Sequence, residues 1–271
     1  MITTLNSRIY DRTVQSYFKT RLAGYWNTLG SNFALSGGYL NTLYDLSGNS
    51  RNFTKNSTNG LTAVTATYPY INQNNPKFYN QGATSDFQGL KCTVCNEAKT
   101  IIVLKSLNNL ASSVATQGEM VELDTVTDER YFLYKVYSAA PVKIYHTTYF
   151  YTAAANTTQR VLHSNLTDAY QRTNQFVIQN IYVPARNGVS KSSEIKQGIG
   201  LEYYAQRYSG LADVVMQPCN EFSICVTKSA GAYVGLTSSF IYQVIEILGD
   251  LSDKDKGFLM GYFKRNYNYC F

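Results

Sequence analysis

The stretch RYFLYKVYSAAPVKIYHTTYFYT, residues 130–152, carries the clearest indication of fold class in this chain. It is dense in tyrosine, phenylalanine, valine and isoleucine, the residue types that favour β-strands. The sequence therefore predicts two strands here, at Arg130–Tyr137 and Val142–Thr152.

Shorter runs on both sides have the same character. Further strands are predicted where apolar residues form short blocks or alternate with polar ones: Ala34–Leu46, Leu61–Tyr70, Thr100–Leu104, Glu119–Thr125, Phe176–Val183 and Glu221–Thr227. Residues 71–90 contain Pro and Gly and are predicted to be an irregular, ordered loop. Because no helices alternate with these strands, antiparallel sheets stacked as a sandwich are expected.

Helices are expected at the two ends of the chain. Residues 3–25 carry apolar side chains at near-helical spacing and predict an amphipathic arm, which docks on a neighbouring subunit or on its own domain. Glu194–Ser209 is predicted as a loop leading to a short helix, and Ser238–Leu248 as a helix. A final helix is capped by Ser252, with Asp255 in its first turn.

The resulting fold class is mainly β with flanking helices (α+β). Residues 1–25 form the helical arm, and residues 26–271 form one β-sandwich domain whose last third is helical. No apolar segment reaches the length of about 18 residues that suggests a membrane span, and no secretory signal is visible, so we expect a cytosolic protein with no membrane partner.

Composition points to contacts between proteins. The chain has 24 tyrosines but only two histidines, and charged residues make up 15%, against about 25% in typical domains. Tyrosine supplies a large, rigid contact surface with a polar tip. The net charge of +6 is spread without a long basic run, so no specific nucleic-acid partner is expected.

The tyrosines cluster in four groups. The candidate contact residues are Tyr131, Tyr134 and Tyr137; Tyr145, Tyr149 and Tyr151; Tyr203, Tyr204 and Tyr208; and Tyr262, Tyr267 and Tyr269. The second group shares one face of its strand, because alternate residues face the same side. An interface is favoured over a purely internal role, since a core rarely needs so many hydroxyl groups.

Catalytic chemistry finds little support. A set drawn from His163, Ser164 and Asp168 is geometrically poor, because adjacent strand residues face opposite sides. His146 lies in a tyrosine-rich strand and is predicted to pack there. No nucleotide-binding or metalloprotease motif occurs, and the Asp250–Asp255 region favours helix capping over calcium. We therefore expect no enzyme, no metal and no required cofactor.

The five cysteines predict mainly reduced thiols. Cys92 and Cys95 form a C-x-x-C, but Cys219 and Cys225 are spaced loosely for a zinc site and no histidine lies near them. A strand context argues against a thioredoxin-like motif. Cys270 is a candidate for a bridge between molecules.

Tyrosine also predicts a response to alkali. Phenols ionise near pH 10, and ionisation of all 24 would subtract 24 charges from a net of +6. An assembly that is cohesive at neutral pH would then repel itself in base.

In the order of its features the chain resembles the cypovirus polyhedrins, the matrix proteins of crystalline viral occlusion bodies. The resemblance rests on the N-terminal arm, the tyrosine- and asparagine-rich β region, and the segments AKTIIVLKSLNNL (98–110) and DVVMQPCNEFSIC (213–225). It implies a β-sandwich flanked by helices, homotrimers packed into a cubic lattice in the cytoplasm of the infected cell, virus particles as occluded cargo, and release in an alkaline gut. It also implies nucleotide held in the lattice, at no residue that the sequence identifies.

Three other classes stay open. A viral jelly-roll coat protein would form closed shells, and an insecticidal crystal toxin would need a membrane-inserting element, for which residues 240–248 are short. An enzyme of unknown class would need a pocket at His146 or His163.

Overall fold

The computed structural model describes residues 14–29, 32–55, 61–68, 71–79, 89–107, 117–125, 129–139, 143–151, 158–163, 176–186, 194, 196–203, 206–207, 218–224, 227–229, 232–234 and 239–267. The strands are β1 (Leu22–Asn27), β2 (Phe33–Ser36), β3 (Tyr39–Leu43), β4 (Phe53–Lys55), β5 (Leu61–Tyr68), β6 (Ile71–Tyr79), β7 (Leu90–Thr93), β8 (Lys99–Leu107), β9 (Gln117–Asp124), β10 (Glu129–Ala139), β11 (Lys143–Tyr151), β12 (Thr158–His163), β13 (Phe176–Val183), β14 (Lys196–Ile199), β15 (Gln206–Arg207), β16 (Glu221–Ile224), β17 (Thr227–Ser229), β18 (Ala232–Val234) and β19 (Ser239–Leu248). Residues 14–18 are helical, and the 3₁₀ turn η1 (Lys19–Arg21) and the helix α2 (Asp253–Tyr267) complete the elements.

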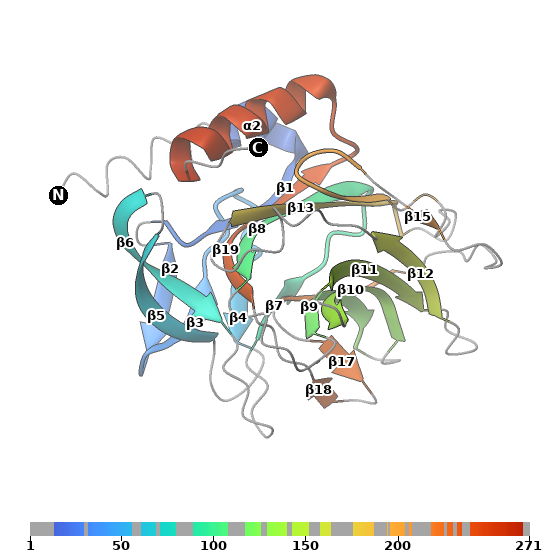
Figure 1. Ribbon diagram of the computed structural model, residues 1–271, viewed down its shortest axis with the longest axis horizontal. Coiled ribbons are helices and arrows are strands. Elements are labelled where there is room, and N and C mark those ends of the chain that lie inside the picture. Colours follow the sequence, from blue (N-terminus) through green and yellow to red (C-terminus); the bar gives the residue numbers. More distant parts are fainter. Residues whose placement is uncertain are drawn as a thin grey trace.

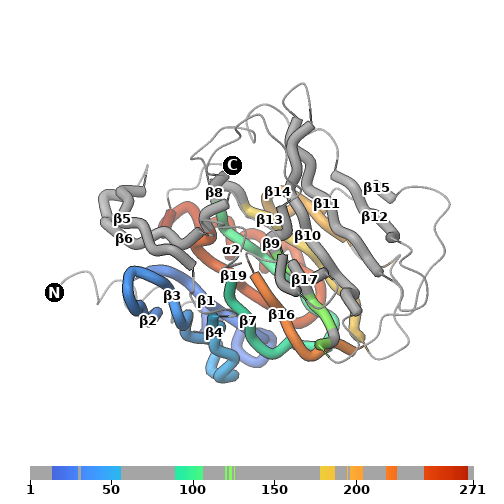
Figure 2. Tube along the Cα trace, turned by 90° about the horizontal axis from the view of Figure 1, so that it is seen from below, coloured from blue at the N-terminus to red at the C-terminus, as the bar shows by residue number. Residues whose placement is uncertain are grey.

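The strand β8 lies at the centre of the fold. It pairs with β19 on one side and β13 on the other, while β1 continues the sheet beyond β19 and β14 continues it beyond β13. Every strand pairing that the structure describes is antiparallel. Figure 2 shows β1 in blue beside β19 in red, from the two ends of the sequence.

Both faces of this central sheet are buried. Along β8, Ile101 and Val103 belong to one apolar core, whereas Ile102 and Leu104 belong to another. Successive strand residues face opposite sides, so a continuous run of β-branched residues fits a strand that is covered on both faces.

A second layer of strands covers one face. It contains β3, β4, β7, β16 and β9, which are paired in that order. Leu43, Phe53, Leu90 and Phe222 of this layer share a core with Trp26 and Val103 of the central sheet. The hairpin from β2 to β3 turns through Gly37 and Gly38, whose positive φ angles of 58° and 83° suit a two-residue turn.

Helix α2 covers the other face. Figure 1 shows it at the top of the molecule, above β1. Leu259, Tyr262, Phe263 and Tyr267 of the helix pack on a core that includes Ile245 of β19. The predicted cap is confirmed: the Asp255 amide donates to Ser252 Oγ at 3.2 Å, and the Ser252 amide donates to Asp255 Oδ2 at 3.0 Å.

The N-terminal segment packs against α2 of its own chain. The rings of Tyr17 and Phe258 stack at 3.9 Å, and Arg21 Nη1 lies 2.9 Å from Asp255 Oδ2. Residues 1–13 of the predicted arm lie outside the described residues. The expected helix to residue 25 is wrong, because Leu22–Asn27 is the strand β1.

The coarse prediction, mainly antiparallel β with a C-terminal helix, is confirmed. The helix predicted at Ser238–Leu248 is wrong, because it is the strand β19. Part of the predicted loop at residues 71–90 is the strand β6, and Lys196–Ile199, expected to be loop, is the strand β14. No helix that the structure describes is long and apolar enough to cross a membrane.

Candidate functional site

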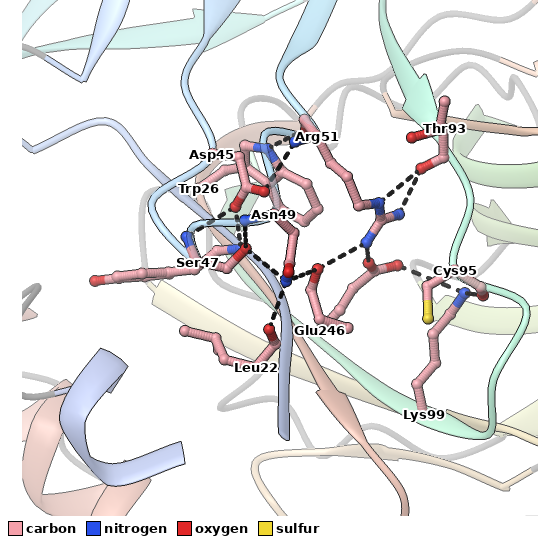
Figure 3. Close-up of polar contacts among 12 residues, drawn as sticks. Leu22, Trp26, Asp45, Ser47, Asn49, Arg51, Thr93, Cys95, Lys99 and Glu246 are labelled. Carbon is pink, nitrogen blue, oxygen red and sulfur yellow. Dashed lines mark hydrogen bonds and ion pairs between the residues drawn. The ribbon is translucent and has the colours of Figure 1, made fainter. Parts of the chain in front are cut away.

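A network of buried charges ties the two strand layers together (Figure 3). Lys99 Nζ of β8 lies 2.5 Å from Glu122 Oε1 of β9 and 3.6 Å from Glu246 Oε1 of β19. Arg186, which follows β13, reaches Glu122 Oε2 at 2.6 Å, and Arg51 pairs with Glu246 Oε2. The side chains of Lys99, Glu122 and Glu246 are fully buried, so these ion pairs act with little screening by water.

The network favours the charged forms of Glu122 and Lys99. Burial alone would raise the pKa of Glu122, but Lys99 and Arg186 outweigh it and keep the pKa below its usual range. Burial would lower the pKa of Lys99, yet the carboxylates of Glu122 and Glu246 raise it. A buried lysine held protonated in this way is a poor base or nucleophile, so the arrangement suits a structural tie.

Arg51 is placed by the loop between β3 and β4. The Asp45 carboxylate accepts hydrogen bonds from the amides of Tyr25, Ser47 and Arg51 at 2.9–3.1 Å. The Arg51 guanidinium then donates to the Thr93 carbonyl and lies over the Trp26 ring, 5.5 Å from its centroid. Figure 3 shows the Arg51 guanidinium between Thr93 and Glu246, with Asp45 close to the Arg51 backbone.

A second polar group lies beneath α2. Tyr267 OH and Tyr262 OH donate to Gln243 Oε1 at 2.7 and 3.1 Å, and the hydroxyls of Tyr25 and Tyr262 are 2.9 Å apart. All four side chains are buried within one chain. The prediction that Tyr262 and Tyr267 lie at contacts between molecules is therefore wrong: their rings fill the core, and an amide side chain satisfies their hydroxyls.

Tyr203 lies near the surface in a different setting. Its hydroxyl donates to Asp250 Oδ1 at 2.8 Å and lies 3.2 Å from Thr100 Oγ1. Lys196 Nζ pairs with Asp250 Oδ2 at 2.7 Å and lies 5.1 Å from the centroid of the Tyr182 ring. Burial, and then the hydrogen bond to Asp250 and its charge, raise the pKa of Tyr203 far above the usual range, although Thr100 opposes this.

Two more described tyrosines share this pattern. Burial and the charge of Asp250 raise the pKa of Tyr182. Burial and the Asp255 carboxylate raise the pKa of Tyr17, against the opposing effect of Arg21. In each case ionisation would place a phenolate beside a carboxylate.

The strand register relates the two groups of tyrosines on β10 and β11. Tyr137 is paired with Tyr145, and Leu133 with Tyr149, whereas Tyr134 is paired with Met120 of β9. Met120 is buried in the core between the layers. Because alternate strand residues occupy opposite faces, positions 137, 145 and 149 share one face of this hairpin, and position 134 lies on the other.

The structure describes only some of the other tyrosines, cysteines and histidines that the sequence analysis singled out. Tyr131 lies on β10 and Tyr151 on β11, while Tyr204, Tyr208, Tyr269 and Cys270 lie outside the described residues. His146 and His163 are cross-strand partners on β11 and β12. Among the described residues, no three His, Cys, Asp or Glu side chains gather in a group that could hold a metal ion.

Sequence reasoning missed the charged network. The available signal was a charge inside an apolar run: Lys99 adjoins TIIVL, and Glu246 interrupts IYQVIEIL. Charged residues are rarely buried unless paired, but a sequence does not show which of its acidic and basic residues meet.

The comparisons with known proteins bear on the fold alone. No protein-family model matches the chain, and no curated protein sequence matches it. The binding domain of botulinum neurotoxin serotype D superposes with a TM-score of 0.55 at 12% identity, covering 91% of this chain and 52% of that one. Trypanosoma rangeli sialidase in complex with sialic acid gives a TM-score of 0.53 at 11% identity, covering 92% of this chain and 33% of that one. The chain thus spans about half or a third of the length of these structures, and it is similar to them in fold.

Proposed function

We propose that this chain is a structural, self-assembling protein, the matrix protein of a viral occlusion body, which coheres at neutral pH and comes apart in alkali. In this proposal the domain is a β-sandwich, the protein forms homotrimers that pack into a lattice in the host cytoplasm, and virus particles are its cargo. No catalytic activity is assigned to it.

The observation that carries the alkaline response is the bond from Tyr203 to Asp250. A neutral phenol donates to a carboxylate, but a phenolate cannot, and it repels the carboxylate instead. Tyr17 has the same relation to Asp255, whereas Asp250 acts on Tyr182 through its charge alone. These pairs lie around the start of α2, so deprotonation would strain the attachment of that helix and of the N-terminal segment.

The observation that supports self-association is the register of β10 and β11. It gathers tyrosines at positions 137, 145 and 149 on one face of the hairpin. Tyrosine-rich faces of this kind are typical of protein contacts. A low density of charge on the chain weakens repulsion between copies at neutral pH.

The test is the dissolution of the native assembly. Particles recovered from cells that express the full chain are titrated from pH 7 to pH 12, and turbidity is measured. The proposal expects micron-scale lattices in electron micrographs and dissolution above about pH 10, because the phenols of an unfolded chain ionise there and the folded assembly, which keeps them protonated, loses stability. Closed shells would favour a coat protein, leakage of liposomes a toxin, and turbidity that stays constant to pH 12 would reject the proposal.

A matched pair of variants locates the contact. Replacing Tyr137, Tyr145 and Tyr149 together with Phe removes three phenols from one face of the hairpin and is expected to move the midpoint of dissolution to higher pH. Tyr134→Phe, at a position on the opposite face of β10 that is paired with Met120, is the control and is expected to leave that midpoint unchanged.

A further inference from the structure

The buried charges between the strand layers form a row in which cations and carboxylates alternate. Each member of this charged row is ion-paired with the next, in the order Arg51, Glu246, Lys99, Glu122 and Arg186. Three cations of the row share two carboxylates, so a cation stands at each end. Because a protein interior screens charge poorly, a cation at such an end is costly unless something offsets it.

The Arg51 end of the row is well satisfied. Its guanidinium donates to the carbonyls of Thr93 and Ala23, each at 3.0 Å, and lies over the Trp26 ring. The Asp45 carboxylate is close, since it accepts a hydrogen bond from the Arg51 amide, and the Arg51 side chain keeps 11% of its surface exposed. Carbonyl groups, an aromatic face, a carboxylate and water thus offset the charge at this end.

Lys99, in the middle of the row, has a partner for each of its donors. Its ammonium lies 2.5 Å from Glu122 Oε1 and 3.6 Å from Glu246 Oε1, and it donates to the Cys95 carbonyl. These three partners match the three donors of an ammonium group. Because Lys99 draws on both carboxylates, the charge of Glu122 is shared between Lys99 and Arg186.

Arg186, at the other end of the row, is left with unused donors. Its side chain is only 1% exposed, and its Nη2 lies 2.6 Å from Glu122 Oε2. Nε and Nη1 are buried, and no group within the described residues accepts a hydrogen bond from either. The Arg186 amide donates to the Asn96 carbonyl at 2.7 Å, which fixes the backbone here. An arginine stays protonated inside proteins, so the loss of a proton cannot relieve the mismatch.

We propose that a small monovalent anion such as chloride binds beside the Arg186 guanidinium. Buried donors in proteins are nearly always paired, and where protein supplies no acceptor an ordered water or ion does. The anion accepts from Nε or Nη1 and adds the negative charge that Arg186 lacks while it shares Glu122 with Lys99. A water molecule would satisfy the same donors without that charge. A large oxyanion such as sulfate would bring more acceptors than one buried guanidinium can satisfy, so the site favours a halide.

The anion would act as a structural ligand of the fold. Glu122 belongs to β9 of the second layer, and Arg186 follows β13 of the central sheet, so an anion at Arg186 strengthens a tie between the two layers. The unfolded chain lacks this arrangement of charges, and a ligand that binds the folded state alone stabilises it by mass action. Chloride is therefore expected to stabilise the protein. This inference stands apart from the proposed function, since it concerns one folded chain.

The first test is thermal unfolding of the full chain at pH 7 over a series of sodium chloride concentrations, with sodium gluconate keeping the ionic strength constant. Gluconate is too large for a buried site of this kind. The Tm is expected to rise with chloride and then level off, by about 3–6 °C once chloride exceeds its Kd tenfold. A Tm without a saturating dependence on chloride would overturn the proposal.

Two arginine variants assign the effect to a residue. Arg186→Met removes the buried donors and should abolish the dependence of the Tm on chloride. Arg265→Met, at an exposed position of α2, is the matched control and should keep it. A chloride dependence that persists in Arg186→Met would overturn the assignment.

Crystals of the full chain grown in sodium bromide give a second test, which stands even if Arg186→Met fails to fold. Bromide scatters anomalously, so a peak is expected in the anomalous difference map within hydrogen-bond distance of Arg186 Nε or Nη1. A map with no peak beside Arg186, or with a water molecule at that place, would overturn the proposal.

Discussion

Tyr203 donates a hydrogen bond to Asp250 over 2.8 Å, so a neutral phenol and a carboxylate jointly fix the turn that precedes α2 to the segment that follows β14. This hydrogen bond cannot persist in strong alkali, because alkali removes the proton that Tyr203 donates.

The variant Tyr203→Phe tests how much this hydrogen bond makes stability depend on pH in alkali. The raised pKa of Tyr203 means that the folded state keeps the proton after the unfolded chain has lost it, so stability falls as pH rises above the unfolded value of about 10. The wild type should lose up to about 1.4 kcal/mol more per pH unit above pH 10 than the variant. At pH 7 the variant should be less stable by about 1 kcal/mol, for the lost hydrogen bonds.

Urea denaturation from pH 7 to pH 11 measures both effects. Tyr44→Phe, at a residue that is 42% exposed, is the control. Equal slopes for wild type and Y203F above pH 10 would contradict the assigned role.

Glu122→Gln tests the network between the layers. The change leaves Lys99 and Arg186 buried without their shared carboxylate, and a broken buried pair costs about 3–5 kcal/mol. Lys91→Met removes the partly exposed partner of Glu221, 3.8 Å away, and is expected to cost less than about 1 kcal/mol. The free energy of unfolding of both variants is measured at pH 7. Similar losses of stability in the two variants would argue against a special role for the network.

Asp255→Asn tests the helix cap on the acid side. Burial alone would raise the pKa of Asp255, but the bonds from Ser252 and the charge of Arg21 lower it. Its contribution is therefore present above the unfolded pKa of about 3.9 and is lost as pH falls through the lower folded pKa. The variant should lose about 0.5–2 kcal/mol at neutral pH and show a shallower fall in stability between pH 5 and pH 2.

Asp253 provides the control for this prediction. It lies in the same first turn, and its side chain is fully exposed. Asp253→Asn removes a carboxylate that takes no part in the cap and should cost less stability at pH 7 than Asp255→Asn, and an equal loss would point to the helix dipole instead of the cap.

Leu259→Ala tests how firmly α2 is attached. Leu259 is fully buried against the central sheet, so its truncation should cost about 2–5 kcal/mol. Met260→Ala, at the neighbouring position and 41% exposed, should stay within about 0.5 kcal/mol of the wild type. The stabilities of both variants are compared by thermal and urea unfolding. Similar losses of stability in the two variants would contradict the prediction.

Sequence reasoning succeeded where a strand has a clear local pattern and failed where both faces are buried. Phe176–Val183 was predicted with its observed bounds, since Pro184 ends the apolar run. Ser239–Leu248 was mistaken for a helix, because a strand covered on both faces shows no alternation and resembles a buried helix. Ile71–Tyr79 was assigned to a loop on account of Pro76, yet this strand pairs with β5 along its length.

The tyrosine clusters were likewise predicted correctly where the pattern is local and wrongly where it depends on distant residues. The sequence predicted that Tyr145 and Tyr149 share a face, a matter of period two. It could not assign Tyr262 and Tyr267 to the core, because that depends on Gln243, a residue of β19.

The position of β19 between β1 and β8 also sets the order of events during synthesis. Arg21 and Leu248, which are bonded across this junction, are 227 residues apart. Until β19 has been made, β1 has no strand to pair with and β8 lacks one of its two neighbours. Closure of such distant contacts is slow and cannot precede the synthesis of β19. A growing chain that has not reached β19 thus lacks a finished surface to offer to other copies, which delays any association until the whole sheet is complete.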